Sequence, residues 1–236
     1  MPVLSAPESD AEMVTELVPG ETLVPLEESA GYLRVNVPCH PSSLDERGYP
    51  GWVSSNSPLV PAGGRSPDLA VARPNRRGLP LGTLLCDTGD YAALPGGDPA
   101  GLEPGDTIAT GAASSDSATG IGLSLLGLPY RWGGTDSTTG MDCSGLVYRM
   151  MQLLGVIVPR DSDDQFERAS FKSEALWEEA CPGDLVFFGR ETITHVGFYL
   201  GGGEYVSAHG GDDTGCVVVR RMTEDPYRGF ARYGQV

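Results

Sequence analysis

The chain changes character near Ser114. Before this residue the sequence consists of short β-type segments separated by turns that contain glycine or proline. After it come two apolar stretches with helical spacing, followed by several strand-like runs. Helices that precede a set of antiparallel strands are typical of the α+β class. We therefore expect an α+β domain over residues 113–236, preceded by small all-β units.

The first 60 residues have the pattern of a small β-barrel. Alternation is clearest in Tyr32-Leu-Arg-Val-Asn-Val37, as in a half-buried strand. The segments with strand character are 13–18, 22–26, 32–37 and 51–54. A Pro-Gly-Glu turn, an apolar strand, a Gly-Tyr-Leu-Arg-Val strand and a closing Gly-Trp-Val strand follow one another, and this order resembles bacterial SH3-like domains. Residues 1–60 are therefore expected to form an SH3-like module.

Residues 61–112 are dense in proline and glycine and contain short apolar pieces such as Leu79-Pro-Leu-Gly-Thr-Leu-Leu85. A long structureless loop is unusual inside a compact protein. We expect a second small β unit here, with an elaborate linker as the alternative.

The last 120 or so residues predict two helices and then a sheet. Ser114 begins a group of N-cap candidates ahead of an apolar helix over 118–128. A second helix starts near Cys143, because apolar residues recur on one face until Gly155 can end it. The expected strands are 184–188, 194–199, 204–207 and 216–219.

Cys143 stands where a nucleophile is expected, between a glycine-broken loop and the second helix. A cysteine at a helix N-terminus meets the positive end of the helix dipole and unpaired N–H groups, which favour the thiolate. His195, on the strand over 194–199, is the candidate base that would take the thiol proton. Of the other two histidines, His40 lies in a proline-rich loop and is expected at the surface.

Composition limits the function classes. The formal charge of −16, without a basic patch, argues against a partner that is a nucleic acid or an anionic membrane. Five widely spaced cysteines without a Cys-x-x-Cys pair predict neither a metal site nor a disulfide framework. The start of the chain has no basic segment followed by an apolar one, so a cytoplasmic location is expected. A secreted protein that had lost its signal peptide would begin in the same way.

Five ordered motifs carry a family resemblance. They are Tyr130-x-Trp-Gly-Gly, Asp142-Cys-Ser-Gly145, Arg160-Asp-Ser162-x-x-Gln165, Pro182-Gly-Asp-Leu-Val-Phe-Phe188 and His195-Val-Gly-x-Tyr199. In this order they resemble the NlpC-like cysteine peptidases of bacterial cell-wall metabolism. The resemblance implies a papain-like fold, catalysis by Cys143 and His195, and no cofactor.

The third catalytic residue is the point where this chain departs from the resemblance. Relatives usually carry a histidine about twelve residues after the catalytic one, and here that position is Ser207. His209 lies two residues later, and residues two apart on a strand point to the same face. A slightly longer turn at Gly201-Gly-Gly203 would bring His209 into place. We therefore expect His209 to be the third residue, with Ser207 as the alternative.

The resemblance also implies a substrate pocket. In relatives with an SH3-like module ahead of the peptidase, residues at the positions of Tyr130, Asp142, Ser144 and Ser162 bind the free amino end of the substrate. A carboxylate such as Asp142 would pair with an ammonium group, although it could equally cap the second helix. Trp132 is expected to form a wall of the cleft. Arg160 and Asp161 are expected to form a structural pair.

The implied reaction is hydrolysis of the γ-D-glutamyl–diamino acid bond in L-Ala-γ-D-Glu-diamino acid peptides from peptidoglycan. A cytoplasmic enzyme of this kind would serve recycling of wall fragments. Two alternatives stay open. One is an amidase or acyltransferase on the same fold, and the other is a wall-fragment binding protein that has lost activity at its third catalytic position.

Overall fold

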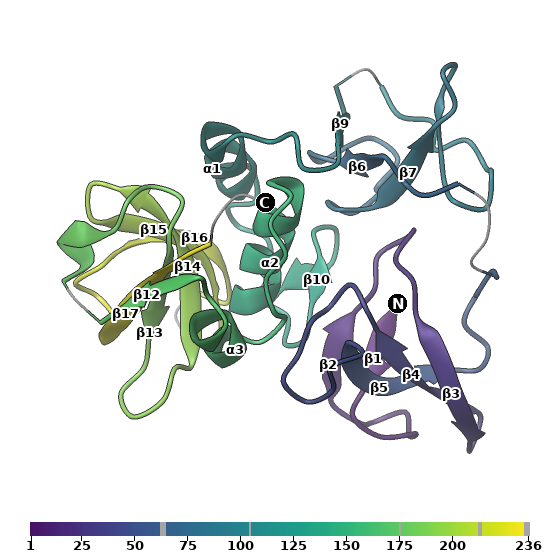
Figure 1. The fold of residues 1–236 in the computed structure, drawn as a ribbon, viewed down its shortest axis with the longest axis horizontal. Coiled ribbons are helices and arrows are strands. Elements are labelled where there is room, and N and C mark those ends of the chain that lie inside the picture. Colours follow the sequence, from purple (N-terminus) through teal and green to yellow (C-terminus); the bar gives the residue numbers. More distant parts are fainter. Residues whose placement is uncertain (62–64, 104, 175, 212–213, 234–236) are drawn as a thin grey trace.

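The computed structural model describes residues 1–61, 65–103, 105–174, 176–211 and 214–233. Two small β units lie on one side of a central helix, and a six-stranded sheet lies on the other (Figure 1). The central helix is α2 (Cys143–Leu153), in which every residue except Gln152 is buried. In the described part of the chain, no helix is both long and apolar enough to cross a membrane. The class is α+β, as the sequence predicts.

The first unit is an antiparallel five-stranded sheet in the order β2-β1-β5-β4-β3. Its strands are β1 (Pro2–Leu4), β2 (Met13–Glu16), β3 (Val24–Ser29), β4 (Tyr32–Val37) and β5 (Tyr49–Ser54). Buried and half-buried residues alternate along β5. The core of the unit includes Val3, Val35 and Val53, and these three side chains are completely buried. This is the all-β N-terminal module that the sequence predicts. β1 was not predicted, because three residues are too few to show alternation.

The second unit lies within the segment expected to be a β unit or a linker. It is a four-stranded sheet in the order β8-β7-β6-β9. The strands are β6 (Leu69–Val71), β7 (Leu84–Asp87), β8 (Ala92–Ala93) and β9 (Thr107–Ala109). The two units touch through their backbones: the Leu84 N–H donates to the Pro19 carbonyl at 3.0 Å. Gly20 has no room for a Cβ, which would lie 2.4 Å from the Leu84 carbonyl oxygen.

The C-terminal domain packs its helices on a sheet in the order β12-β17-β13-β14-β15-β16. Besides α2, its elements are α1 (Ser115–Ser124), β10 (Thr135–Asp136), β11 (Gly140–Met141), α3 (Ser162–Glu167), β12 (Phe171–Ser173), the 3₁₀ helix η1 (Trp177–Glu179), β13 (Leu185–Phe188), β14 (His195–Gly201), β15 (Glu204–His209), β16 (Cys216–Arg221) and β17 (Tyr227–Arg232). The four predicted strands correspond to β13–β16. β17 and β12 extend the sheet beyond β13, and the two arginines and the glycine of β17 conceal its strand character.

A buried ion pair joins the C-terminal domain to the first unit. Arg149 of α2 donates to both carboxylate oxygens of Glu21, at 2.5 and 3.0 Å. His40, expected at the surface, is instead fully buried, because its ring nitrogens have partners in Glu21 (3.2 Å) and Thr15 (2.8 Å). Although burial raises the pKa of Glu21, Arg149 and His40 hold it well below its ordinary value. Glu21 is therefore a buried carboxylate that depends on Arg149 for its counter-charge.

Replacing Arg149 by methionine is expected to lower the free energy of unfolding by about 3–5 kcal/mol, because Glu21 would keep its charge without a cationic partner. The matched control is Arg34→Met, which removes an exposed ion pair with Glu27 and is expected to cost at most about 1 kcal/mol. Urea denaturation of both variants measures the difference. Equal losses for the two variants would contradict this account of the interface.

Candidate active site

Cys143 is the first residue of α2. Asp142 caps this helix by accepting a hydrogen bond from the Gly145 N–H at 2.6 Å. A side chain at position 145 has no room, since a Cβ there would lie 2.2 Å from the Gly134 carbonyl oxygen. The start of the helix and the preceding turn are therefore packed backbone against backbone, which fixes the position of the Cys143 thiol.

The Cys143 thiol and the His195 ring are both buried enough to favour their neutral forms. Burial, followed by the charge of Asp142, raises the pKa of Cys143 to about 12. Burial, with His209 adding to it, lowers the pKa of His195 to about 3. This differs from the thiolate that a helix N-terminus alone favours. In the resting protein near neutral pH the thiol keeps its proton, and it needs a base to become a nucleophile.

β14 brings His195 to the start of α2. The backbone N–H of Val196, the next residue on this strand, lies close enough to the Cys143 thiol to lower the pKa of that thiol. On its other side His195 pairs with Phe188 of β13, and the two ring centroids are 5.9 Å apart. The candidate nucleophile and the candidate base are thus brought together by packing of α2 on β14.

The register of the β14–β15 hairpin places His209 beside His195. Phe198 pairs with Val206 and Tyr199 with Tyr205, and continuing this register sets His195 opposite His209. The two Nε2 atoms are 3.0 Å apart, and the ring centroids are 4.1 Å apart.

Ser207 contacts the same nitrogen of His195. Its Oγ lies 3.0 Å from His195 Nε2 and donates its single proton to the Val196 carbonyl at 2.6 Å. The oxygen must therefore accept a hydrogen bond from His195, which places the ring proton on Nε2. In the part of the chain that the structure describes, no hydrogen bond involves His195 Nδ1. Nδ1 is left as the basic nitrogen.

Asp142, predicted to bind an ammonium group, is occupied by protein donors. Its carboxylate accepts five hydrogen bonds, from the N–H groups of Gly133 and Gly145, the Ser144 hydroxyl and two nitrogens of Arg160. The two Arg160 bonds are 3.1 and 2.7 Å long. A carboxylate offers about four lone-pair positions, so its helix-capping and ion-pairing roles account for Asp142.

Asp161 is a half-buried carboxylate that can accept more additional hydrogen bonds than Asp142. It was expected to pair with Arg160, but Arg160 forms its ion pair with Asp142 instead. The hydroxyl of Tyr49, from β5 of the first unit, lies close to the Asp161 carboxylate. Burial raises the pKa of Asp161, although Arg160 and Tyr49 oppose the shift. Tyr49 was not singled out from the sequence, because its contact joins two domains.

The other predicted pocket residues lie around the start of α2 and α3. Ser144 donates to Asp142 and accepts from Arg160, whereas Ser162 is the half-buried first residue of α3. Tyr130 packs so closely on the end of β15 that a Cβ at Gly210 would lie 2.7 Å from its ring. Burial and the nearby Cys143 raise the pKa of Tyr130 above its ordinary value. Trp132, expected as a wall of the cleft, is 62% exposed.

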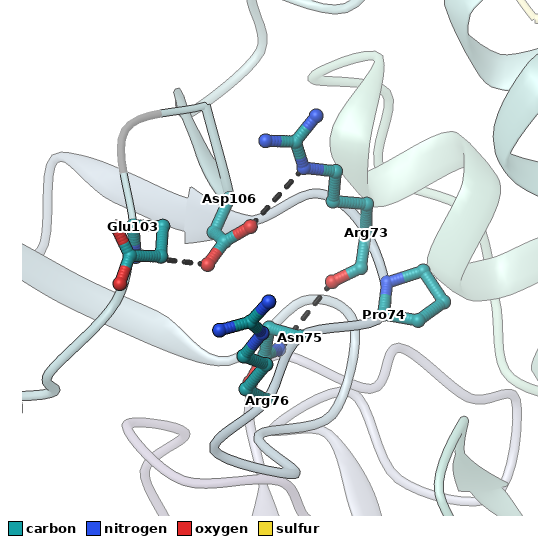
Figure 2. A pocket seen from close by; sticks show the side chains of 6 residues that line it. All are labelled: Arg73, Pro74, Asn75, Arg76, Glu103 and Asp106. Carbon is teal, nitrogen blue, oxygen red and sulfur yellow. Dashed lines mark hydrogen bonds and ion pairs between the residues drawn. The ribbon is translucent and has the colours of Figure 1, made fainter.

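Two hollows lie away from these residues. One of about 600 Å³ is on the second unit (Figure 2), where Arg73 donates to Asp106 at 3.1 Å and the Glu103 N–H donates to the same carboxylate. Another of about 540 Å³ lies between all three units and includes Cys39 and Tyr148 in its lining. None of the predicted site residues lines either hollow. The candidate site is therefore identified from the contacts and chemistry of its residues and not from a cavity.

One group of side chains has the composition of a metal site. Ligand atoms of Glu21, Cys39 and His40 lie within 4.8 Å of one another. The Arg149 guanidinium already binds both oxygens of Glu21, and His40 Nδ1 is engaged by Thr15. A positive charge thus occupies the place that a metal ion would need, and the residues do not fit a cation.

Comparison with known proteins places this geometry in context. Residues 127–230 match the NlpC/P60 family. The gamma-D-glutamyl-L-lysine dipeptidyl-peptidase of Bacillus subtilis (strain 168) is 27% identical over 93% of this chain and 79% of the relative. The protein of the same description from Bacillus cereus (strain ATCC 10987 / NRS 248) is 29% identical over 83% of this chain and 67% of the relative. Both matches extend beyond 127–230 into the β units.

The fold has a counterpart among solved structures. The crystal structure of an NlpC/P60 family protein from Bacillus cereus ATCC 10987 superposes with a TM-score of 0.77, over 94% of this chain and 82% of that chain. At 24% sequence identity this likeness concerns the fold.

The contacts at His195 predict how the two candidate third residues differ. His209→Ala is expected to slow alkylation of Cys143 by iodoacetamide more than tenfold, because the ring that holds His195 in place is lost. Ser207→Ala removes one neutral hydrogen bond, worth about 1 kcal/mol, and should slow it about fivefold. Mass spectrometry of the Cys143 peptide gives the rate, with the exposed Cys181 as an internal reference. A larger loss in Ser207→Ala would make Ser207 the third residue.

Proposed function

This chain belongs to the NlpC/P60 family of peptidoglycan hydrolases through residues 127–230, and on that premise we propose that it is a cysteine peptidase acting on wall-derived peptides. The proposed bond is the γ-D-glutamyl–diamino acid bond of L-Ala-γ-D-Glu-diamino acid peptides. The observation that carries the proposal is the His195 ring, which is held against α2 with Nε2 engaged and Nδ1 open as the base.

The proposed mechanism starts from the neutral pair. His195 Nδ1 takes the proton of the Cys143 thiol, and the thiolate formed attacks the γ-glutamyl carbonyl carbon. The negative charge on the carbonyl oxygen is stabilised by the Cys143 backbone N–H at the helix start, with the Tyr130 hydroxyl as a second donor. His195 then gives its proton to the leaving amine of the diamino acid. Water hydrolyses the acyl-enzyme and restores the thiol.

Recognition of the substrate's free amino end is proposed at the junction with the first unit. The two related proteins are described as dipeptidyl-peptidases, and an enzyme that removes dipeptides must detect the amino terminus two residues from the scissile bond. Asp142 is saturated with donors, so we assign the ammonium group to Asp161, which is partly desolvated and lies close to the Tyr49 hydroxyl. Ser144, Ser162 and Tyr130 remain part of the proposed pocket, with Trp132 at its edge.

Incubation with L-Ala-γ-D-Glu-meso-diaminopimelate is expected to release L-Ala-D-Glu, detected by chromatography. Cys143→Ala should abolish release. The N-acetylated tripeptide should be cleaved at least 100-fold more slowly, because a buried carboxylate would lose its cationic partner. Binding of the tripeptide without cleavage would instead favour a wall-fragment binding protein, and transfer to an added amine in preference to water would favour an acyltransferase.

Asp161→Asn separates the proposed amine site from the chemistry. It should raise KM about tenfold or more with little change in kcat, since a charge-assisted hydrogen bond is worth about 1.5–3 kcal/mol. Asp163→Asn is the matched control, because Asp163 is an exposed carboxylate of the same segment. Equal KM values for the two variants would remove Asp161 from the site.

A role in recycling of wall fragments and a location in the cytoplasm are part of the proposal. Both follow from the preference for a free amino end, since such peptides arise after the wall has been cut. Cell fractionation with an antibody against the protein tests the location.

A further inference from the structure

A second polar pair lies behind the two histidines. Tyr205 of β15 is completely buried, and its hydroxyl oxygen is 3.3 Å from His209 Nε2. The same hydroxyl donates to Asp225 Oδ2 at 2.5 Å, a short charge-assisted bond. Asp225 lies between β16 and β17, and its side chain is 22% exposed. With the 3.0 Å contact between the histidines, these groups form a continuous polar chain from a carboxylate to the proposed base.

The hydrogen bonds determine what each member can do. Tyr205 has one hydroxyl proton and gives it to Asp225, so its oxygen offers only lone pairs to His209. Ser207, which gives its proton to the Val196 carbonyl, likewise offers only lone pairs to His195. A single proton lies between the Nε2 atoms of His195 and His209. The closer Ser207 contact, 3.0 Å against 3.3 Å, favours that proton on His195 in the neutral pair.

The Tyr205 oxygen is therefore an acceptor that the neutral histidine pair does not use. In the neutral pair the Tyr205 oxygen has no proton to accept from His209. When His195 Nδ1 takes the proton of Cys143, the pair gains a positive charge, and the proton between the rings can be shared with His209. Only then does His209 become a donor to Tyr205, whose hydroxyl is fixed by a carboxylate. An interaction that is stronger in the charged state than in the resting state lowers the barrier to reaching the charged state.

Asp225 is the main negative charge that acts on the pair. Burial lowers the pKa of His209, and Asp225 is the strongest charge opposing the shift, with Glu224 in the same direction. Arg220 of β16 acts against them, and its Nε lies 3.2 Å from Asp225 and 3.1 Å from Glu224. The Tyr205 hydroxyl on β15 also contacts His209, and the Cys143 thiol on α2 lies near Val196, the residue after His195.

We propose that Asp225 and Tyr205 are positioning residues of the proposed peptidase: they hold His209 against His195 and supply the negative charge that stabilises the protonated histidine pair. The proton moves from Cys143 Sγ to His195 Nδ1, leaving a thiolate and one positive charge shared by the two rings. The assignment to catalysis rests on the proposed function. Sequence reasoning did not reach these residues, because Asp225 approaches from a turn outside the family motifs.

The test compares Asp225→Asn and Tyr205→Phe with the control Glu224→Gln. Glu224 is the adjacent carboxylate and contacts the same arginine, but no hydrogen bond in the described residues joins it to Tyr205. Alkylation of Cys143 at mildly acidic pH is measured first, since it needs no substrate. Asp225→Asn and Tyr205→Phe should each slow it about tenfold, the change that corresponds to one pKa unit in the histidine pair. Glu224→Gln should slow alkylation much less than Asp225→Asn, because Glu224 acts on the histidine pair in the same direction but more weakly than Asp225.

Cleavage of the tripeptide gives the second measurement. The two variants should lower kcat and leave KM unchanged, because neither residue touches substrate. The acidic limb of kcat/KM, which reports protonation of the resting histidine pair, should move to lower pH by about one unit, since an imidazolium that loses a nearby carboxylate gives up its proton more readily. Asp225→Glu should restore part of the rate. If Asp225 and Tyr205 had a purely structural role, variants with an unchanged melting temperature would show the pH profiles of the parent protein.

The outcomes separate the inference from the proposed function. If Asp225→Asn and Glu224→Gln alkylate equally fast, the inference is wrong, whatever the protein cleaves. If the variants alkylate slowly but the parent does not cleave the tripeptide, the positioning role stands and the proposed substrate is wrong. If Asp225→Asn does not fold, Tyr205→Phe decides the matter, because it removes a single oxygen atom from the chain of contacts.

Discussion

The buried ion pair between Arg160 and Asp142 is the interaction on which the rest of the site depends. Asp142 caps α2 directly ahead of Cys143, and Arg160 neutralises that cap with two hydrogen bonds. The remaining nitrogen of Arg160, Nε, donates to Thr15 of the first β unit at 3.0 Å. One guanidinium therefore connects the first unit, the helix that carries the thiol and the segment ahead of α3. Loss of either charge would leave the other buried without a partner.

This arrangement makes the first β unit part of the proposed active site. Thr15 contacts Arg160, and Tyr49 contacts Asp161, which is next to Arg160 in sequence. Arg149 forms a parallel link from α2 to Glu21. The first unit thus positions groups near Cys143 through polar contacts with Arg160, Asp161 and Arg149. In an isolated C-terminal domain Arg149 would lose its ion-pair partner Glu21, and Arg160 would keep Asp142 but lose its hydrogen bond to Thr15.

Sequence patterns predicted the elements whose signal is local. α2 and β13–β16 are runs with one consistently buried face or an unbroken apolar stretch, so periodicity finds them. α1 ends at Ser124 rather than at Leu128, because the apolar residues continue past the last helical turn. β12 and β17 have no such run: β17 pairs with the edge of β13, and β12 pairs in turn with β17. The family motifs likewise placed Cys143 and His195, since both follow elements with a strong local pattern.

What could not be predicted depends on contacts between distant segments. The sequence predicted amine binding by Asp142 and a pair between Arg160 and Asp161, and only the position of Arg160 shows that Asp142 is the saturated carboxylate. His40 lies in a loop that looks exposed until Glu21 and Thr15 close on it. The spacing of residues does not reveal how a hairpin turns, so the sequence could not show that both Ser207 and His209 reach His195.

That register also limits how the site can evolve. Because alternate residues of a strand face opposite sides, a one-residue change in the turn at 201–203 would present Ala208 or another residue of the wrong face to His195. Unless the sheet is rebuilt, a replacement for the third residue can therefore arise only at every second position of β15. Ser207 and His209 occupy two such neighbouring positions, and both reach His195 Nε2. β15 thus carries two residues that can each contact the base. Evolution could exchange one for the other as the third residue without an intermediate protein in which His195 has no partner.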